Sequence, residues 1–191
     1  MRAVELTAWL EDRMPGVSRR WLGQLEGLQT AASSQEWAQV LEDFVQLIAA
    51  ALPPTLGPLR DEVEPLWVRI SELYGTTAAW RGLAAGEVVE EVQLLRELVI
   101  RELYRDPPLG GRVPLSLRDV LRLNRSIDRA VTHASVGHTD AMFFQLFERG
   151  DGDEAPSGEP VAEVREQLAN IGEELAGLRA MSTQLAGSAE H

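Results

Sequence analysis

The sequence predicts an all-α fold: a helical bundle of about six helices followed by a C-terminal heptad helix. Apolar residues recur at three- and four-residue spacing through nearly the whole chain, and no segment shows the alternating pattern of a strand. The chain has 191 residues, of which 45% are hydrophobic and 25% charged. It is therefore long enough to bury a core and too apolar to be disordered.

The N-terminal part of the chain predicts three helices. A short first helix ends at Pro15, because proline interrupts a helix interior. Ser18 has the side chain to cap a second helix. A third begins at a capping box headed by Ser33, and Pro53 ends it.

Two further helices are predicted in the middle of the chain. One covers about residues 65–80 and the next about 87–104, with the glycines at 82 and 86 between them. Apolar residues cover more than half the circumference of the second, which is typical of a helix buried on several sides. We therefore expect residues 87–104 to form the central helix of the domain.

The sixth predicted helix begins at Ser116 and runs to about Phe147. Asp119 follows Ser116 by three residues, which is the spacing of a capping pair. Residues 150–160 then have the glycine-, aspartate- and proline-rich composition of a linker. The sequence thus separates a helical domain over residues 1–149 from the segment that follows the linker.

Residues 161–186 carry the most regular period of the chain. Apolar residues repeat at the three–four spacing of a coiled-coil seam: Val161, Val164, Leu168, Ile171, Leu175, Leu178 and Leu185. If two copies pair in parallel, Glu174 of one can meet Arg179 of the other, which favours a homodimer. The alternative is that this helix docks on its own domain as one more member of the bundle.

A set of short, spaced motifs lies in the middle of the chain. It consists of Tyr74, Gly75, Arg81, Gly82, Glu91, Leu95, Arg96, Asn124, Ile127 and Asp128. The types and spacing of these residues resemble the N-terminal helical domain of the RsbRD type. The chain departs from that pattern at three positions, because Tyr74, Val92 and Leu123 stand where the family usually has histidine, tyrosine and phenylalanine. The domain occurs in stressosome co-antagonists and at the front of bacterial sensor histidine kinases.

The resemblance implies a cytoplasmic signalling input domain that acts through protein contacts. It also implies a globin-like arrangement of helices that does not require haem. The expected partner is an output protein such as a kinase or a sigma or anti-sigma regulator.

Composition narrows the function classes further. The chain has no cysteine and no lysine, and all 18 of its basic residues are arginine, which excludes thiolate metal sites, a Walker-type phosphate loop and Schiff-base chemistry. A formal net charge of −12 disfavours nucleic-acid and anionic-membrane partners. No catalytic motif and no cofactor motif is present, so the sequence predicts neither an enzyme nor a cofactor.

Four arginines form the most distinctive charged pattern. Arg118, Arg122, Arg125 and Arg129 follow one another by four, three and four residues, which places them on one face of the sixth helix. In an acidic protein they could receive an acidic partner or an anion. The alternative is that they are solvated or paired with neighbouring acidic residues.

Polar residues near the apolar stripe of the same helix predict a structural network. Asn124 and Asp128 need partners if they are buried, and Arg96 or Arg81 can supply them. The carboxylates of Glu87, Glu90 and Glu91 could form an acid–base cluster, but they are expected to be first-turn residues that interact favourably with the helix dipole.

Histidines and tryptophans leave one rival function open. His133 and His138 are five residues apart, so they cannot grip one metal ion from one helix face, and packing is the expected role of His138. Five tryptophans in a helical domain are expected in the core. The alternative function is a ligand- or haem-binding sensor or carrier with a globin-like fold.

Overall fold

The computed structural model describes residues 3–28, 35–107, 116–148 and 159–188. Its elements are α1 (Ala3–Leu28), α2 (Gln35–Ala51), the short 3₁₀ helix η1 (Pro53–Leu56), α3 (Arg60–Trp80), α4 (Ala85–Arg105), α5 (Leu117–Glu148) and α6 (Glu159–Ser188). The described residues contain no strand, so the all-α prediction is confirmed. None of the helices in the described ranges is long and apolar enough to cross a membrane.

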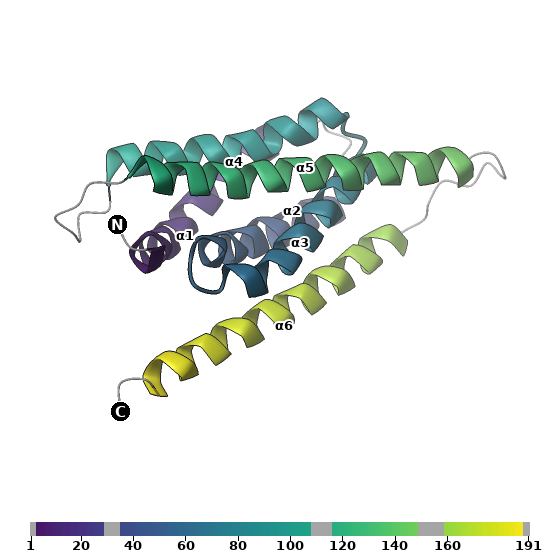
Figure 1. Ribbon diagram of the computed structural model, residues 1–191. Coiled ribbons are helices and arrows are strands. Elements are labelled where there is room, and N and C mark those ends of the chain that lie inside the picture. Colours follow the sequence, from purple (N-terminus) through teal and green to yellow (C-terminus); the bar gives the residue numbers. More distant parts are fainter. Residues whose placement is uncertain (1–2, 29–34, 108–115, 149–158, 189–191) are drawn as a thin grey trace.

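The helices form a bundle in which α3 is central (Figure 1). Helices α4 and α5 lie beside each other on one side, α1 and α2 lie beneath them, and α6 crosses the opposite side against α2 and α3. Helix α3 packs against α2, α4, α5 and α6. The prediction that residues 87–104 form the central helix is therefore wrong, because α4 packs mainly against α1 and α5.

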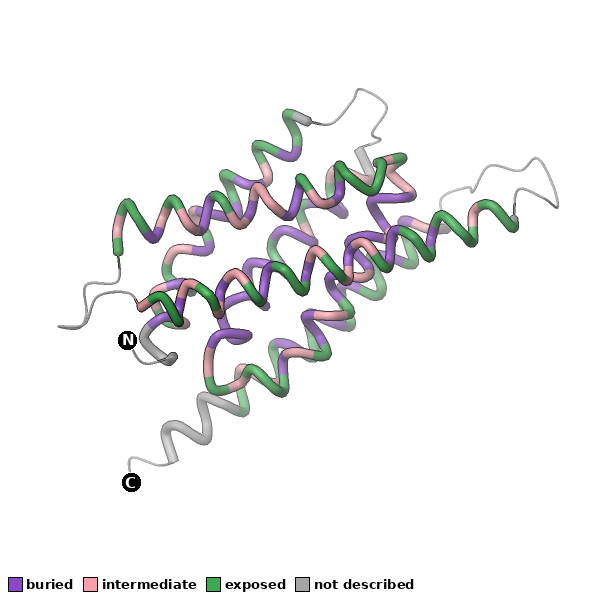
Figure 2. The backbone as a smooth tube through the Cα atoms, turned by 45° about the horizontal axis from the view of Figure 1, so that its top comes forward, coloured by how far each residue is buried: buried purple, intermediate pink, exposed green. Residues whose placement is uncertain are grey.

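One continuous hydrophobic core joins all six helices. Most of the helices turn a stripe of buried residues inward and leave the other side exposed (Figure 2). Helix α3 is the exception, because none of its residues from 70 to 80 is exposed. The largest fully buried side chains are Trp21, Trp67, Tyr74 and Phe44. Trp21 and Tyr74 lie with ring centroids 6.2 Å apart, and Phe44 meets Tyr74 edge-on at 5.4 Å. These aromatic contacts tie α1, α2 and α3 together.

Helix α1 runs through Pro15, which the sequence predicted as its end. Met14 and Val17 on either side of the proline are buried in the core. Ser18 and Arg19 both donate side-chain hydrogen bonds to the carbonyl oxygen of Pro15. Burial of this face thus outweighs the backbone hydrogen bond that proline cannot donate, and the two predicted helices are one.

One other predicted boundary is wrong: the helix predicted over residues 65–80 begins five residues earlier, at Arg60, and Pro65 lies inside it. Three further boundaries agree with the structure where it describes them. Helix α2 ends at Ala51, just before Pro53, although the predicted cap at Ser33 lies outside the described residues. Gly82 separates α3 from α4 with a φ of 82°, a backbone conformation that favours glycine. Ser116 and Asp119 hydrogen-bond reciprocally at the start of α5, as the capping pair predicted.

Helix α6 docks on its own chain. Its seam residues Val161, Val164, Leu168, Ile171 and Leu175 are buried against the bundle, and Leu178 is partly buried. Glu174 pairs with Arg69 of α3 at 2.7 Å, and Arg179 pairs with Glu11 of α1 at 2.6 Å. The structure therefore shows the intramolecular alternative. The homodimer stays a prediction, and the side chain of Leu185 lies outside the described residues.

Helices α3 and α5 approach each other unusually closely at two glycines. A Cβ atom on Gly75 would overlap the backbone carbonyl of Ala134, and one on Gly137 would overlap the backbone of Glu72. Thr76 also donates a hydrogen bond from Oγ1 to the Gly137 carbonyl oxygen at 3.2 Å. The crossing fixes α5 against α3 and so determines where the arginines of α5 lie.

Candidate functional site

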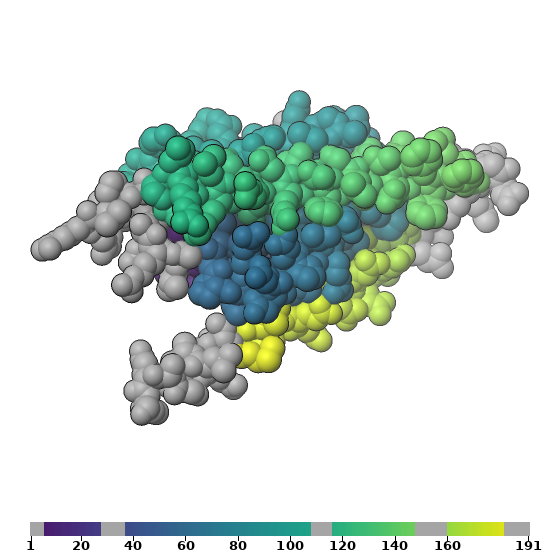
Figure 3. All heavy atoms as spheres, viewed as in Figure 1, coloured from purple at the N-terminus to yellow at the C-terminus, as the bar shows by residue number. Residues whose placement is uncertain are grey.

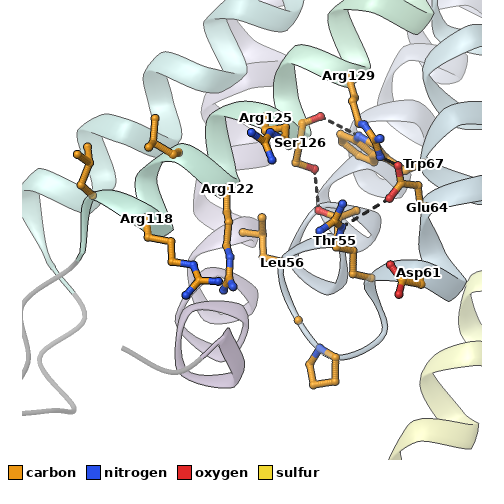
Figure 4. Close-up of a pocket in the computed structure, with 15 residues that line it drawn as sticks. Thr55, Leu56, Asp61, Glu64, Trp67, Arg118, Arg122, Arg125, Ser126 and Arg129 are labelled. Atoms are coloured by element: carbon orange, nitrogen blue, oxygen red, sulfur yellow. Dashed lines mark hydrogen bonds and ion pairs between the residues drawn. The ribbon is translucent and has the colours of Figure 1, made fainter.

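Four arginines of α5 line one groove on the surface of the bundle (Figure 4). The groove lies between the first half of α5, η1 and the start of α3, and its volume is about 720 Å³. Arg118, Arg122, Arg125 and Arg129 all contribute to its lining, as does Arg60 of α3. We call this hollow the arginine groove. The structure thus brings together all four residues of the predicted face.

The floor of the groove contains a hydrogen-bond network whose polar groups are satisfied within the protein. Thr55 of η1 and Ser126 of α5 share a hydrogen bond of 2.7 Å between their hydroxyl oxygens. Trp67 of α3 donates from Nε1 to the Ser126 carbonyl oxygen at 2.9 Å. Leu56 is buried beside them. Because these polar groups already have partners, the arginines are the principal groups that can bind a ligand here.

Charge is unevenly distributed along the groove. Its lining holds five arginines but only two acidic residues, Asp61 and Glu64. Glu64 forms an ion pair with Arg129, and its Oε2 lies 3.6 Å from Nε of Arg60. The other three arginines, Arg118, Arg122 and Arg125, make no ion pair with any described residue. The predicted alternative was that these arginines are solvated or paired. Of the four on α5, Arg129 is paired, whereas Arg118 and Arg125 are exposed to solvent and Arg122 is half-buried.

Two leucines add an apolar edge to the arginine groove. Leu117 and Leu121 both line it, and they are 73% and 57% exposed. They are four residues apart, so they lie on the same face of α5, next to the arginines. Exposed apolar side chains beside a charged groove are typical of a surface that contacts another protein.

A space-filling view shows how this surface lies on the molecule. Helices α5 and α3 form neighbouring bands across one face of the bundle, and α6 lies beyond α3 (Figure 3). The groove side of α5 therefore remains uncovered by α6.

Three residues of the spaced motifs, Tyr74, Arg81 and Glu91, form a buried network away from the groove. Arg81 donates two hydrogen bonds to the carboxylate of Glu91, at 2.9 Å and 3.2 Å, and their side chains are only 2% and 4% exposed. Tyr74 donates from its hydroxyl to Oε2 of Glu91 at 2.6 Å. Trp21 of α1 donates from Nε1 to the backbone oxygen of Glu91 at 2.8 Å. The network joins α1, α3 and α4.

Burial and neighbouring charge shift the pKa values of Tyr74 and Arg81 in this network. Burial raises the pKa of the Tyr74 phenol well above its usual value, and the adjacent Glu91 carboxylate raises it further. Burial alone would lower the pKa of Arg81, but the hydrogen bonds and charge of Glu91 outweigh it and leave that pKa raised. Arg81 is therefore a fixed cation and Tyr74 a neutral donor, which is suited to a structural role.

The expectation that Glu91 is an ordinary first-turn carboxylate is wrong, because it is buried beneath α1 and bonded to Arg81. Glu87 does have the expected role, since its carboxylate accepts a hydrogen bond from the backbone N–H of Ala84 at the start of α4. Of the other motif residues, Leu95 and Ile127 are in the core.

The predicted partners of Asp128 and Asn124 are only partly found. Asp128 pairs with Arg96, but its side chain is 61% exposed, so the pair is a surface one. Asn124 donates to the backbone oxygen of Val120 on its own helix. The side-chain hydrogen bonds and the ion pair of Arg81 are made with Glu91 instead.

Both histidines of α5 have structural contacts. Nδ1 of His133 lies 2.9 Å from a carboxylate oxygen of Glu72 on α3. Nε2 of His138 lies 2.7 Å from the backbone oxygen of Leu83, in the turn between α3 and α4. His138 is buried. It packs inside the bundle, as the sequence predicted.

Sequence reasoning missed an exposed apolar cluster at the end of α5. Met142, Phe143, Phe144, Leu146 and Phe147 are all exposed, as the last turns of the helix show in Figure 2. The signal was present, because apolar residues follow one another there without helical spacing and cannot all face one side. It also missed the pairing of Glu64 with Arg129, which joins residues far apart in the chain.

Comparison of the chain with protein-family models, with curated proteins and with solved structures gave no match.

Proposed function

We propose that this chain is a non-catalytic, cytoplasmic regulatory domain of a bacterial signalling system that acts by binding a protein partner. The arginine groove carries the proposal. A chain with a net charge of −12 gathers five arginines around one hollow, and three of them have no acidic partner among the described residues. Like charges held together repel one another, so an external acidic group that binds there is favoured electrostatically.

The surroundings of the groove support a protein as the partner. Leu117 and Leu121 offer apolar contact area beside the positive charge. Arginine is also enriched at protein interfaces, where its planar guanidinium binds carboxylates in a defined geometry. The resemblance to the RsbRD-type domain is consistent with this proposal, and it suggests a kinase or a sigma or anti-sigma regulator as the output protein.

The rival function, a ligand- or haem-binding sensor, has less support. An interior gap between Trp21, Trp67 and Tyr74 has a volume of about 10 Å³, which is room for one water molecule at most. The two histidines of α5, which could serve as haem ligands, lie against Glu72 and against the backbone oxygen of Leu83. The described interior thus offers little room for a ligand at this position.

Photo-crosslinking in the cells that produce the protein tests the proposal. A crosslinking amino acid in place of Leu121 is expected to form a defined adduct with another protein. The double substitution Arg122→Glu and Arg125→Glu should reduce that adduct by at least about tenfold, because it reverses the charge beside the crosslinker. The adduct is measured by mass spectrometry.

Tyr104 provides the matched control position, since it is 86% exposed and lies on α4. A crosslinker there should not form the same adduct. If the adducts at positions 104 and 121 are the same, or if the charge reversals leave the yield at 121 unchanged, the groove is not the partner's binding site.

A further inference from the structure

We infer that the arginine groove binds an acidic amphipathic α-helix of the partner, and that Glu64 occupies the place of one of its carboxylates in the free protein. This inference rests on the proposed function and specifies its partner. Three observations carry it: the length of the arginine row, the leucines beside it, and the ion pair between Glu64 and Arg129.

The length of the row selects an extended partner. Arg118 and Arg129 are eleven residues apart on one helix, which is about 16 Å along its axis. A single small anion does not span the length of this row. A helix with acidic residues at four-, three- and four-residue spacing presents a row of carboxylates of the same length.

The two exposed leucines indicate that the partner helix also has an apolar face. Leu117 and Leu121 lie beside Arg118 and Arg122, so a helix that meets the arginines also contacts these apolar side chains. Its acidic face must therefore border an apolar one. A nucleic-acid strand also carries a row of negative charges, but the net charge of −12 repels it, and the aromatic residue in the groove, Trp67, is buried and cannot stack on a base.

Glu64 acts as an internal competitor for the partner. Its side chain is 26% exposed, and it holds Arg129 while lying near Arg60. An incoming carboxylate must separate Glu64 from Arg129 before it can make its own bidentate contact. Removing the charge of Glu64 leaves Arg129 available and should raise the affinity.

Fluorescence anisotropy with designed peptides tests the inference. The probe is a helical peptide of about 16 residues, with glutamates at the spacing of the four arginines and leucines on the adjoining face. Its comparison is a scrambled peptide of the same composition. The patterned peptide should bind at least about tenfold more tightly, and more weakly as salt is added. Glu64→Gln should increase its affinity roughly threefold to fivefold.

Glu97→Gln is the matched control variant. Glu97 also pairs with an arginine, Arg101, but both lie exposed on α4, so the affinity should stay unchanged. Equal binding of the two peptides, or tighter binding of a single-stranded oligonucleotide, would overturn the acidic helix as the occupant. An unchanged affinity in Glu64→Gln would overturn the role of Glu64. Neither result would overturn the proposed protein partner itself, because the crosslinking experiment detects a partner of any shape.

Discussion

Glu91→Ala is expected to lower the free energy of unfolding by about 3–5 kcal/mol, the range for breaking a buried ion pair by removing one partner. Without the carboxylate, the Arg81 guanidinium stays buried without a counter-charge, and the hydroxyl of Tyr74 loses its acceptor. Nε of Arg81 already has no hydrogen-bond partner among the described residues, so the guanidinium has little other compensation. Urea denaturation followed by tryptophan fluorescence measures the change.

Glu90→Ala is the matched control, because Glu90 precedes Glu91 on the same helix and is exposed. Its free energy of unfolding should stay within about 0.5 kcal/mol of the wild-type value. If Glu91→Ala unfolds at the same urea concentration as Glu90→Ala, the ion pair does not hold α3 to α4.

Gly75→Ala is expected to destabilise the protein by about 3 kcal/mol or more, which is the upper range for overpacking. The added methyl group would overlap the Ala134 carbonyl, and a backbone group of a packed helix cannot move aside as a side chain can. Gly137→Ala should behave similarly, because it meets the backbone of Glu72 from the other helix. Thermal unfolding followed by circular dichroism gives the midpoints.

Gly23→Ala is the control for these two variants, and it is expected to raise the stability rather than lower it. Gly23 lies in α1, is exposed, and has open space where its Cβ would be. Gly23→Ala should therefore stabilise the protein by about 0.5–1 kcal/mol through the higher helix propensity of alanine. A Gly75→Ala variant that also gains stability would mean that α3 and α5 do not approach as closely as the structure shows.

Local patterns in the sequence predicted the helices but not how they meet. The structure confirms two local predictions, the reciprocal capping of Ser116 and Asp119 and the end of α2 just before Pro53. Both features depend only on residues that are close in the chain, so a local pattern can predict them. Pro15 was predicted to end a helix because its local effect is unfavourable. Packing of Met14 and Val17 into the core overrides it, and this tertiary contribution is not visible in the local pattern.

The candidate site shows the same division. The spacing of the arginines predicted that they lie on one face of a helix, and in the structure all four line one groove. The other wall of the groove comes from η1 and the start of α3, which are remote in the chain. Helical spacing therefore could not predict that Glu64 pairs with Arg129, nor that Glu91 turns inward to Arg81. For α6, a heptad seam fits a second copy and the chain's own bundle equally well.

The most direct test of the groove as the docking surface is to record the backbone amide NMR signals of the isotope-labelled protein during addition of the patterned acidic peptide. We expect the largest shifts in residues 117–130 of α5, in η1 and in the first turn of α3, because these segments form the groove. The largest shifts at residues 142–147 of α5 or in α6, with the groove unchanged, would contradict the account.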